Sequence, residues 1–229
     1  MRSRARRGHF IVLEGLDGAG TTTQTRQLAS WLEGQGRKVH VTAEPSGGPV
    51  GGLVRQVLTG RVAGGPEGAP FDPAALALLF AADRLDHVAS EIRPRLVDGW
   101  DVVSDRFTLS SLAYQAATCG DARWVEAING LAPAPDVTLF LQVSARTALR
   151  RRFAASARRD LFEVPAFQAR VARAYQRGIA RLRALGQRVE EVDGTRPVEE
   201  VTAALVRAMA DLYGDGPAPR ARRRQAVTE

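Results

Sequence analysis

Residues 9–14 form a short apolar stretch that runs into a glycine-rich loop and then into a segment with helical periodicity. Residues 15–22 read GLDGAGTT, which fits the phosphate-binding pattern GxxxxGK[ST] at every position but one. Glycines let backbone N–H groups turn toward a phosphate, and the start of the helix adds partial positive charge. The spacing predicts a strand, a phosphate loop and a helix; the loop alone leaves a glycine turn without a ligand equally open.

One position of this loop departs from the pattern. Thr21 stands where a lysine normally reaches the phosphates, whereas Thr22 keeps the hydroxyl that ligates Mg²⁺. Loss of a phosphate-bridging cation costs about 10²- to 10³-fold in rate unless another charge replaces it. We expect ATP to bind along the whole loop, through Gly15, Leu16, Asp17, Gly18, Ala19, Gly20, Thr21, Thr22 and Thr23.

The rest of the chain alternates strand-like and helical segments. Strands are expected at 38–45, 100–105, 135–143 and 188–193, in addition to the one at 9–14. A long helix is expected over 73–97, bent or ended near Arg93 because Pro94 cannot donate a helical hydrogen bond. The alternation predicts an α/β fold of three layers, a five-stranded parallel sheet with helices on both faces and ligands at the carboxyl ends of its strands.

Size and composition favour one globular domain. The chain has 229 residues, 45% of them hydrophobic, and no apolar run long enough for a membrane span. A single cysteine forms no internal disulfide and no leader pattern is apparent, so we expect a cytoplasmic protein. The expected domain covers 9–212, with a lid at about 150–163 and basic disordered tails at 1–8 and 213–229.

The net charge of +7 is carried by the two ends of the chain. Residues 1–7 hold four arginines, and residues 217–229 hold four arginines and one glutamate, which leaves the body neutral. A neutral body is not the footprint of a nucleic-acid-binding protein, so we expect no specific nucleic-acid partner and no membrane partner.

Three further motifs follow the loop in order. They are EPSGGPVG at 44–51, FAADR at 80–84 and SDRFTLSSLAYQ at 104–115. Together these stretches resemble the thymidylate kinases, and the resemblance covers residues 9–212. It implies a P-loop kinase fold, transfer of a phosphoryl group from ATP to dTMP giving dTDP and ADP, and a homodimer.

The resemblance also implies roles for the acceptor site. Phe80 would stack on thymine, Arg84 would hydrogen-bond its exocyclic oxygen, and Ser111 and Gln115 would contact the base edge. Arg106 would hold the dTMP phosphate, Tyr114 would exclude a ribose hydroxyl, and Pro45 belongs to the same set. Aromatic stacking and an arginine fork suit a base and a phosphate dianion. The alternative for Phe80 is core packing, and for Arg84 a surface ion pair.

Three carboxylates complete the implied site. Asp17 would lie near the sugar 3′-hydroxyl, Glu44 would order the dTMP end, and Asp105 would orient Mg²⁺ together with Thr22. Capping of the following helix is the alternative for Asp105.

The catalytic pattern departs from the family at several positions. Besides Thr21, Gln142 replaces an aspartate, Leu161 stands where Asp-Arg is usual, and Ser46 replaces a glycine. We expect arginines of the lid to supply the missing charge, namely Arg151, Arg152, Arg158 and Arg159, with Arg150 nearby. A degenerate nucleotide-binding paralogue with little kinase activity, and a kinase for another deoxynucleotide, remain the alternatives.

Overall fold

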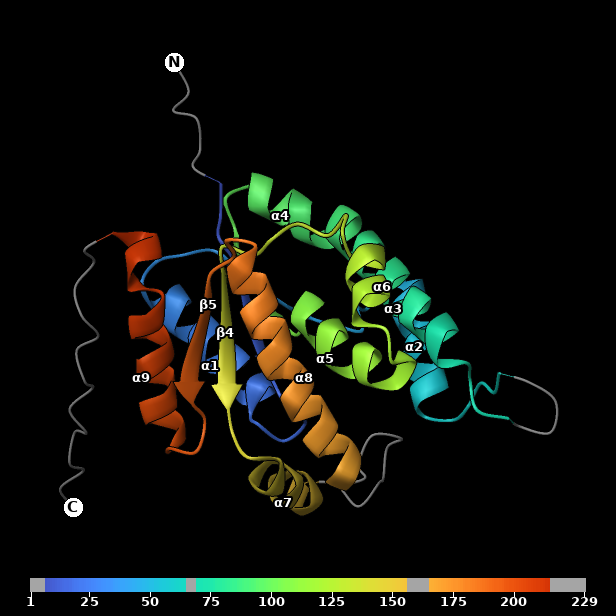
Figure 1. Ribbon diagram of the computed structural model, residues 1–229. Coiled ribbons are helices and arrows are strands. Elements are labelled where there is room, and N and C mark those ends of the chain that lie inside the picture. Colours follow the sequence, from blue (N-terminus) through green and yellow to red (C-terminus); the bar gives the residue numbers. More distant parts are fainter. Residues whose placement is uncertain (1–6, 65–68, 156–164, 215–229) are drawn as a thin grey trace, which may run out of the picture.

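A parallel sheet of five strands forms the centre of the molecule. The computed structural model describes residues 7–64, 69–155 and 165–214 (Figure 1). The strand order is β2-β3-β1-β4-β5, which confirms the predicted α/β architecture. The strands are β1 (Phe10–Gly15), β2 (Val39–Ala43), β3 (Asp101–Asp105), β4 (Val137–Gln142) and β5 (Val189–Asp193). The central strand β1 pairs with β3 on one side and β4 on the other, so the loop that follows it lies where the connections diverge.

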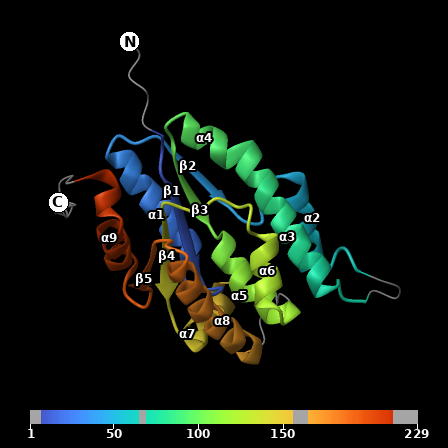
Figure 2. The same ribbon diagram turned by 45° about the horizontal axis from the view of Figure 1, so that its top comes forward.

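Helices cover both faces of this sheet, as Figures 1 and 2 show. On one face α1 (Thr21–Gly34) and α9 (Val198–Ala208) pack on the side chains of Ile11 and Leu13. On the other face Phe10 and Val12 pack near α4 (Arg93–Val97), and α5 (Thr108–Cys119) and α8 (Pro165–Ala184) pack together beside them. Alternate residues of β1 therefore face opposite layers, as the geometry of a strand requires.

The predicted long helix over 73–97 is present but is not interrupted at Arg93. It runs as α3 (Pro73–His87), a π-helical turn (Val88–Ile92) and α4. Pro94 lacks an N–H and its ring crowds the carbonyl of Ser90, so a wider turn before it relieves the clash without ending the helix. The proline therefore disturbs the helix as predicted, and the disturbance is the π-helical turn that directly precedes Arg93.

The remaining elements are α2 (Pro49–Leu58), α6 (Ala122–Ile128), α7 (Ala145–Ala155) and a 3₁₀ turn (Ala210–Tyr213). The 3₁₀ turn lies at the amino ends of the strands, where Tyr213 contacts His9 and Asp101. The predicted final helix over 197–212 thus ends earlier, and its last residues tighten into that turn. None of the described helices combines the length and the apolar character needed to cross a bilayer. Most of both expected tails, and the expected lid from residue 156 onward, lie outside the described residues.

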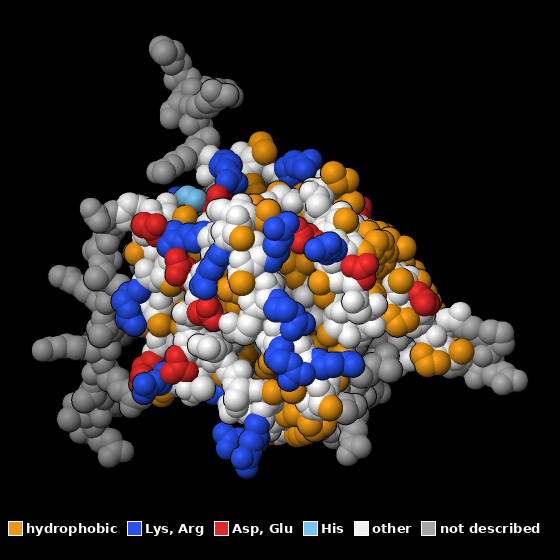
Figure 3. Space-filling model, viewed as in Figure 1, with side chains coloured by type: hydrophobic (Ala, Val, Ile, Leu, Met, Phe, Trp, Pro, Cys, Tyr) orange, Lys and Arg blue, Asp and Glu red, His pale blue; other side chains and the backbone are white. Residues whose placement is uncertain are grey.

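The basic residues of the body are unevenly placed. Helix α8 contains five arginines and no acidic residue, and Figure 3 shows Lys and Arg side chains gathered along it. One of them, Arg181, pairs with Glu126 of α6 at 2.7 Å. The neutral total of the body thus conceals a basic side.

Candidate functional site

The phosphate loop, residues 15–23, connects β1 to α1. Gly18 and Gly20 have φ values of 89° and 99°, which side chains rarely adopt. A Cβ on Gly18 would also lie 2.2 Å from the carbonyl oxygen of Ala148, so α7 approaches the loop closely. The amide of Ala19 donates to Leu16 O at 2.8 Å and closes the turn. The N–H groups of the first turn of α1 and the helix dipole can therefore bind an anion beside α7.

The side chain at position 21 carries no charge to this site. Thr21 is buried, and its Cγ2 lies 3.2 Å from where a Cβ on Gly15 would stand. Thr22 is exposed, and its hydroxyl donates to Asp105 Oδ2 at 2.5 Å. The other oxygen, Asp105 Oδ1, is buried and has no hydrogen-bond partner among the residues that the structure describes. A hydroxyl beside an unpartnered carboxylate oxygen fits the oxygen-rich coordination that Mg²⁺ prefers.

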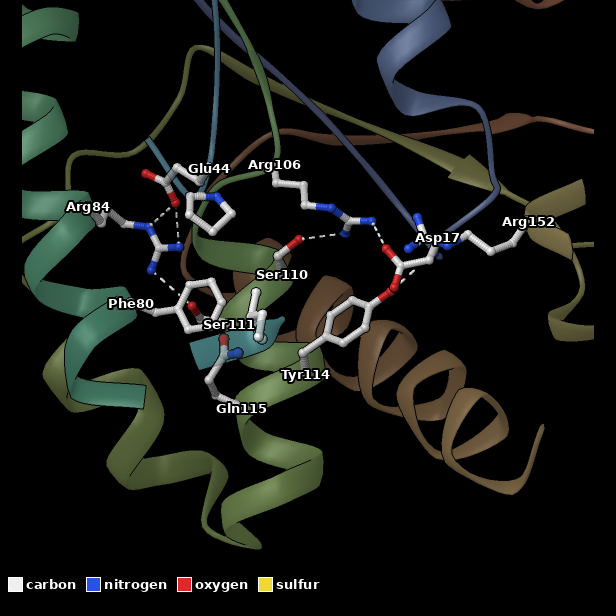
Figure 4. A pocket seen from close by; sticks show the side chains of 12 residues that line it. Asp17, Glu44, Phe80, Arg84, Arg106, Ser110, Ser111, Tyr114, Gln115 and Arg152 are labelled. Atoms are coloured by element: carbon white, nitrogen blue, oxygen red, sulfur yellow. Dashed lines mark hydrogen bonds and ion pairs between the residues drawn. The ribbon is translucent and has the colours of Figure 1, made fainter. Parts of the chain in front are cut away.

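The acceptor cavity opens next to the phosphate loop and has a volume of about 190 Å³ (Figure 4). Every residue that the sequence analysis assigns to the substrate lines it, although these residues come from four separate segments of the chain. The lining residues are Asp17, Glu44, Pro45, Leu58, Phe80, Arg84, Arg106, Ser110, Ser111, Tyr114, Gln115 and Arg152. Figure 4 shows Phe80 and Gln115 near one end of the cavity and Arg106 and Asp17 near the other.

At the first end, Arg84 is held by the protein itself. Its Nε and Nη2 donate to Glu44 Oε2 at 2.9 and 2.6 Å, and Nη2 also donates to Phe107 O. Its Nη1 donates to Ser111 Oγ at 3.0 Å and to Asn129 Oδ1. Arg84 is only 1% exposed, so it is not the surface ion pair that the sequence left as an alternative. Its N–H donors are already engaged by groups of the protein. A base oxygen gains Arg84 only by displacing one of these acceptors.

Glu44 lies at this end of the cavity between two partners. Its Oε2 accepts from Arg84, and its Oε1 lies 3.3 Å from Nδ1 of His87. The Nε2 of His87 lies 2.7 Å from the hydroxyl of Thr42. Both Glu44 and His87 are buried. These contacts hold the carboxylate of Glu44 in place.

At the second end, Arg106 and Asp17 form an ion pair. Arg106 Nη2 donates to Asp17 Oδ1 at 2.5 Å, and the side chains are 19% and 27% exposed. The hydroxyl of Tyr114 accepts from the Asp17 amide at 3.1 Å, and the Arg106 guanidinium stands 5.3 Å from the Tyr114 ring centre. Burial by itself lowers the pKa of Arg106, but Tyr175 and then Asp17 raise that pKa well above its ordinary value. The cation is therefore retained for an anionic ligand.

The lid arginines divide into separate groups. Arg152 lines the acceptor cavity, and in Figure 4 its side chain reaches from α7 toward Asp17. Arg151 instead donates to Gly194 O at 2.8 Å and to Thr195 O at 3.3 Å, beyond the end of β5. Arg150 is exposed. Arg158 and Arg159, and the altered position Leu161, lie outside the described residues.

Several residues of the site were not found from the sequence. Ser110 and Leu58 line the cavity. Glu14 and Tyr175 contact Arg106 or its neighbours from beneath the cavity. A glutamate within an apolar strand is a signal that could have found Glu14, since burying a charge is costly without partners. Tyr175 gives no such signal, because an aromatic residue on the buried side of a helix is ordinary.

Comparisons with known proteins identify the family of this chain. A family model described as thymidylate kinase matches residues 13–205. A probable thymidylate kinase of Thermococcus kodakarensis is 36% identical over 207 residues, 90% of this chain and 99% of the relative. A probable thymidylate kinase of Pyrobaculum calidifontis is 39% identical over 208 residues, covering 89% and 98%. A thymidylate kinase of Leifsonia xyli subsp. xyli is 41% identical over 208 residues, covering 87% and 93%. The chain therefore belongs to the thymidylate kinase family.

Proposed function

We propose that this protein transfers the γ-phosphoryl group of ATP to dTMP, giving dTDP and ADP. The observation that carries the proposal is the acceptor cavity, in which every residue assigned to the nucleotide from the sequence lines one space beside the phosphate loop. A protein that only bound ATP would have no need of a second site that contains a complete set of nucleotide-binding residues.

The acceptor nucleotide is placed by the two ends of the cavity. Phe80 stacks on the thymine ring, while Ser111 and Gln115 contact its edge. Arg106 holds the phosphate as a charge-assisted fork, and Asp17 fixes Arg106 from the phosphate loop. Tyr114 lies under that ion pair and leaves no room for a ribose 2′-hydroxyl.

Phosphoryl transfer then depends on positioning and on charge. The backbone N–H groups of the phosphate loop cradle the phosphates of ATP. Arg152 reaches the cavity from α7 and supplies the positive charge of the missing loop lysine, because Thr21 is neutral and buried. Arg158 and Arg159 are further candidates for this role.

Thr22 and Asp105 are the residues that would hold Mg²⁺ with ATP. Their support is the hydroxyl–carboxylate pair and the buried oxygen of Asp105, which no group in the described part of the chain contacts by a hydrogen bond. When bound, the ion neutralises phosphate charge and orients the oxygens of ATP. The side chains of Thr22 and Asp105 fix the position of this site relative to the loop.

We further infer a cytoplasmic homodimer. The family is typically homodimeric through its helices. Leu53 of α2 and Leu78 and Leu85 of α3 are 38%, 50% and 36% exposed, and α2 and α3 pack side by side. Such a surface is suited to cover by a second copy.

A steady-state assay of ADP formation tests the catalytic proposal. We expect turnover with dTMP in the presence of Mg²⁺, little with the other deoxynucleoside monophosphates, and none after chelation of divalent ions. Preference for another acceptor would support the broader-kinase alternative. Tight binding of ATP and dTMP without turnover, restored by Thr21→Lys, would instead establish a degenerate paralogue.

A further inference from the structure

Arg106 has an unusual backbone conformation. Its φ is 80°, and it is the one non-glycine with positive φ among residues 7–64, 69–155 and 165–214. This region is disfavoured for a residue with a side chain, so the surrounding structure must hold it. The amide of Arg106 donates to Leu13 O at 2.9 Å, and its carbonyl accepts from the hydroxyl of Ser104 at 2.8 Å.

A buried carboxylate fixes the residues that follow. Glu14 of β1 is fully buried, and its Oε1 accepts from the amides of Phe107 and Ser110 at 2.9 and 3.0 Å. The side chain of Phe107, which precedes α5, makes no capping hydrogen bond to that helix. Glu14 of β1 supplies the capping acceptor instead. Burial raises the pKa of Glu14, whereas Arg106 and the donors of Ser110 and Phe107 lower it. This contact, rather than Asp105, supplies the start of α5 with an acceptor.

The hydroxyl of Tyr175 connects this support to the Arg106 side chain. It accepts from Arg106 Nη1 at 3.0 Å and lies 2.9 Å from Gly15 O, to which it donates. Ser110 Oγ accepts from the same Nη1 at 3.0 Å and donates to Glu14 Oε2 at 2.6 Å. The Tyr175 ring is fully buried, with its centre 5.0 Å from that of Phe140. One edge of the guanidinium is thus anchored by β1, α5 and α8 together.

We propose that Tyr175 is a positioning residue for the acceptor phosphate, acting with Ser110 and Glu14 to fix the plane of the Arg106 guanidinium. The inference rests on the proposed function, because it requires that Arg106 bind the phosphate of the acceptor. Nη1 is held by protein oxygens and Nη2 by Asp17, so the direction of the remaining N–H groups into the cavity is set before the nucleotide arrives. Tyr175 itself is not among the residues that line the cavity.

The test is calorimetric binding of dTMP and thymidine, which differ only in the phosphate. Tyr175→Phe keeps the buried ring and removes one hydroxyl. We expect it to weaken dTMP binding about tenfold, the loss typical of a hydrogen bond to a charged group, and to leave thymidine binding unchanged. Ser110→Ala, which removes another of the three acceptors of Nη1, is expected to do the same. In an Arg106→Ala background, Tyr175→Phe is expected to add no further loss.

Tyr213→Phe is the matched control. Its hydroxyl donates to Asp101 at 3.1 Å, away from both the cavity and the phosphate loop, so we expect unchanged affinity for either ligand. A purely structural role of Tyr175 would weaken dTMP and thymidine equally, and that result would overturn the inference, as would an unchanged dTMP affinity in both the Tyr175 and Ser110 variants. Wild-type protein that binds dTMP no better than thymidine would overturn the proposed phosphate site and the inference together.

Discussion

The acceptor cavity and the phosphate loop differ in the charged side chains that they carry. In the cavity, Arg84 and Arg106 are each bound to a carboxylate, at 2.6 Å from Glu44 and at 2.5 Å from Asp17. In the loop, the glycine geometry is intact but position 21 holds a buried, neutral threonine. The arginines of the cavity thus have acidic partners, one of them from the loop itself, whereas the loop carries no cation of its own.

This difference indicates where substitutions are tolerated. Backbone N–H groups bind phosphate whichever side chain follows Gly20, so the loop keeps its anion site without a lysine. A cation needed for the transferring phosphoryl group can come from any element that reaches it, and α7 packs against Gly18. Base recognition has no such freedom, because each contact must meet a particular atom of the nucleotide.

The largest effect is expected from Arg106→Ala, which tests the cavity directly. The acceptor phosphate would lose a charged fork and Asp17 its partner, so kcat/KM for dTMP should fall about 10³-fold. Steady-state kinetics measure this, with Arg123→Ala, an exposed arginine of α6, as the control expected to match wild type. Unchanged dTMP kinetics in Arg106→Ala would show that another group holds the phosphate.

The next effect concerns the loop and its neighbour. Arg152→Ala should lower kcat about 10²-fold with a smaller change in the KM for ATP, the pattern of an interaction made mainly in the transition state. Neutralising Arg151 and Arg152, or Arg158 and Arg159, as pairs is expected to act similarly.

Thr21→Lys sharpens this test. The lysine should change wild-type kcat little but restore the Arg152→Ala variant, since both cations would serve the same phosphoryl group. A sharp rise of kcat in Thr21→Lys alone would contradict the comparison, because it would show that nothing in the native chain replaces the loop lysine.

A smaller effect is expected at the base. Phe80→Ala removes a stacking surface, which is worth about 1 to 3 kcal/mol per base, so KM for dTMP should rise about tenfold with little change in kcat. The KM for ATP serves as the internal control. If the KM values for ATP and dTMP rose together, Phe80 would be a core residue of α3, the alternative that its sequence context left open.

The smallest effect is expected from the ends of the chain. Removing residues 1–6 and 217–229 takes away seven arginines and one glutamate, all outside the described residues. We expect unchanged kcat and KM but weaker retention on a cation-exchange resin. A truncated protein that folds and no longer phosphorylates dTMP would show that the tails belong to one of the two sites.

Much of the acceptor site could be predicted because its residues sit in short motifs. Phe80 and Arg84 are one helical turn apart, and Ser111 and Gln115 likewise, so each pair shares a helix face. The supporting contacts could not be predicted. Tyr175 meets Gly15 across 160 positions of sequence, and Asn129 meets Arg84 across 45. Contacts between residues so far apart in the sequence cannot be predicted from the spacing of residues within one segment.

The sequence by itself determined the parallel α/β fold and the phosphate loop, since periodicity and motif spacing are local properties of the chain. It indicated the set of residues around the acceptor through its resemblance to the thymidylate kinases. Only the tertiary structure decided between neighbouring arginines. Arg151 and Arg152 are adjacent in sequence, yet one binds the carbonyl of Gly194 and the other lines the cavity. Successive side chains on a helix point about 100° apart, so the packing of α7 against Gly18 selects which of them faces the acceptor.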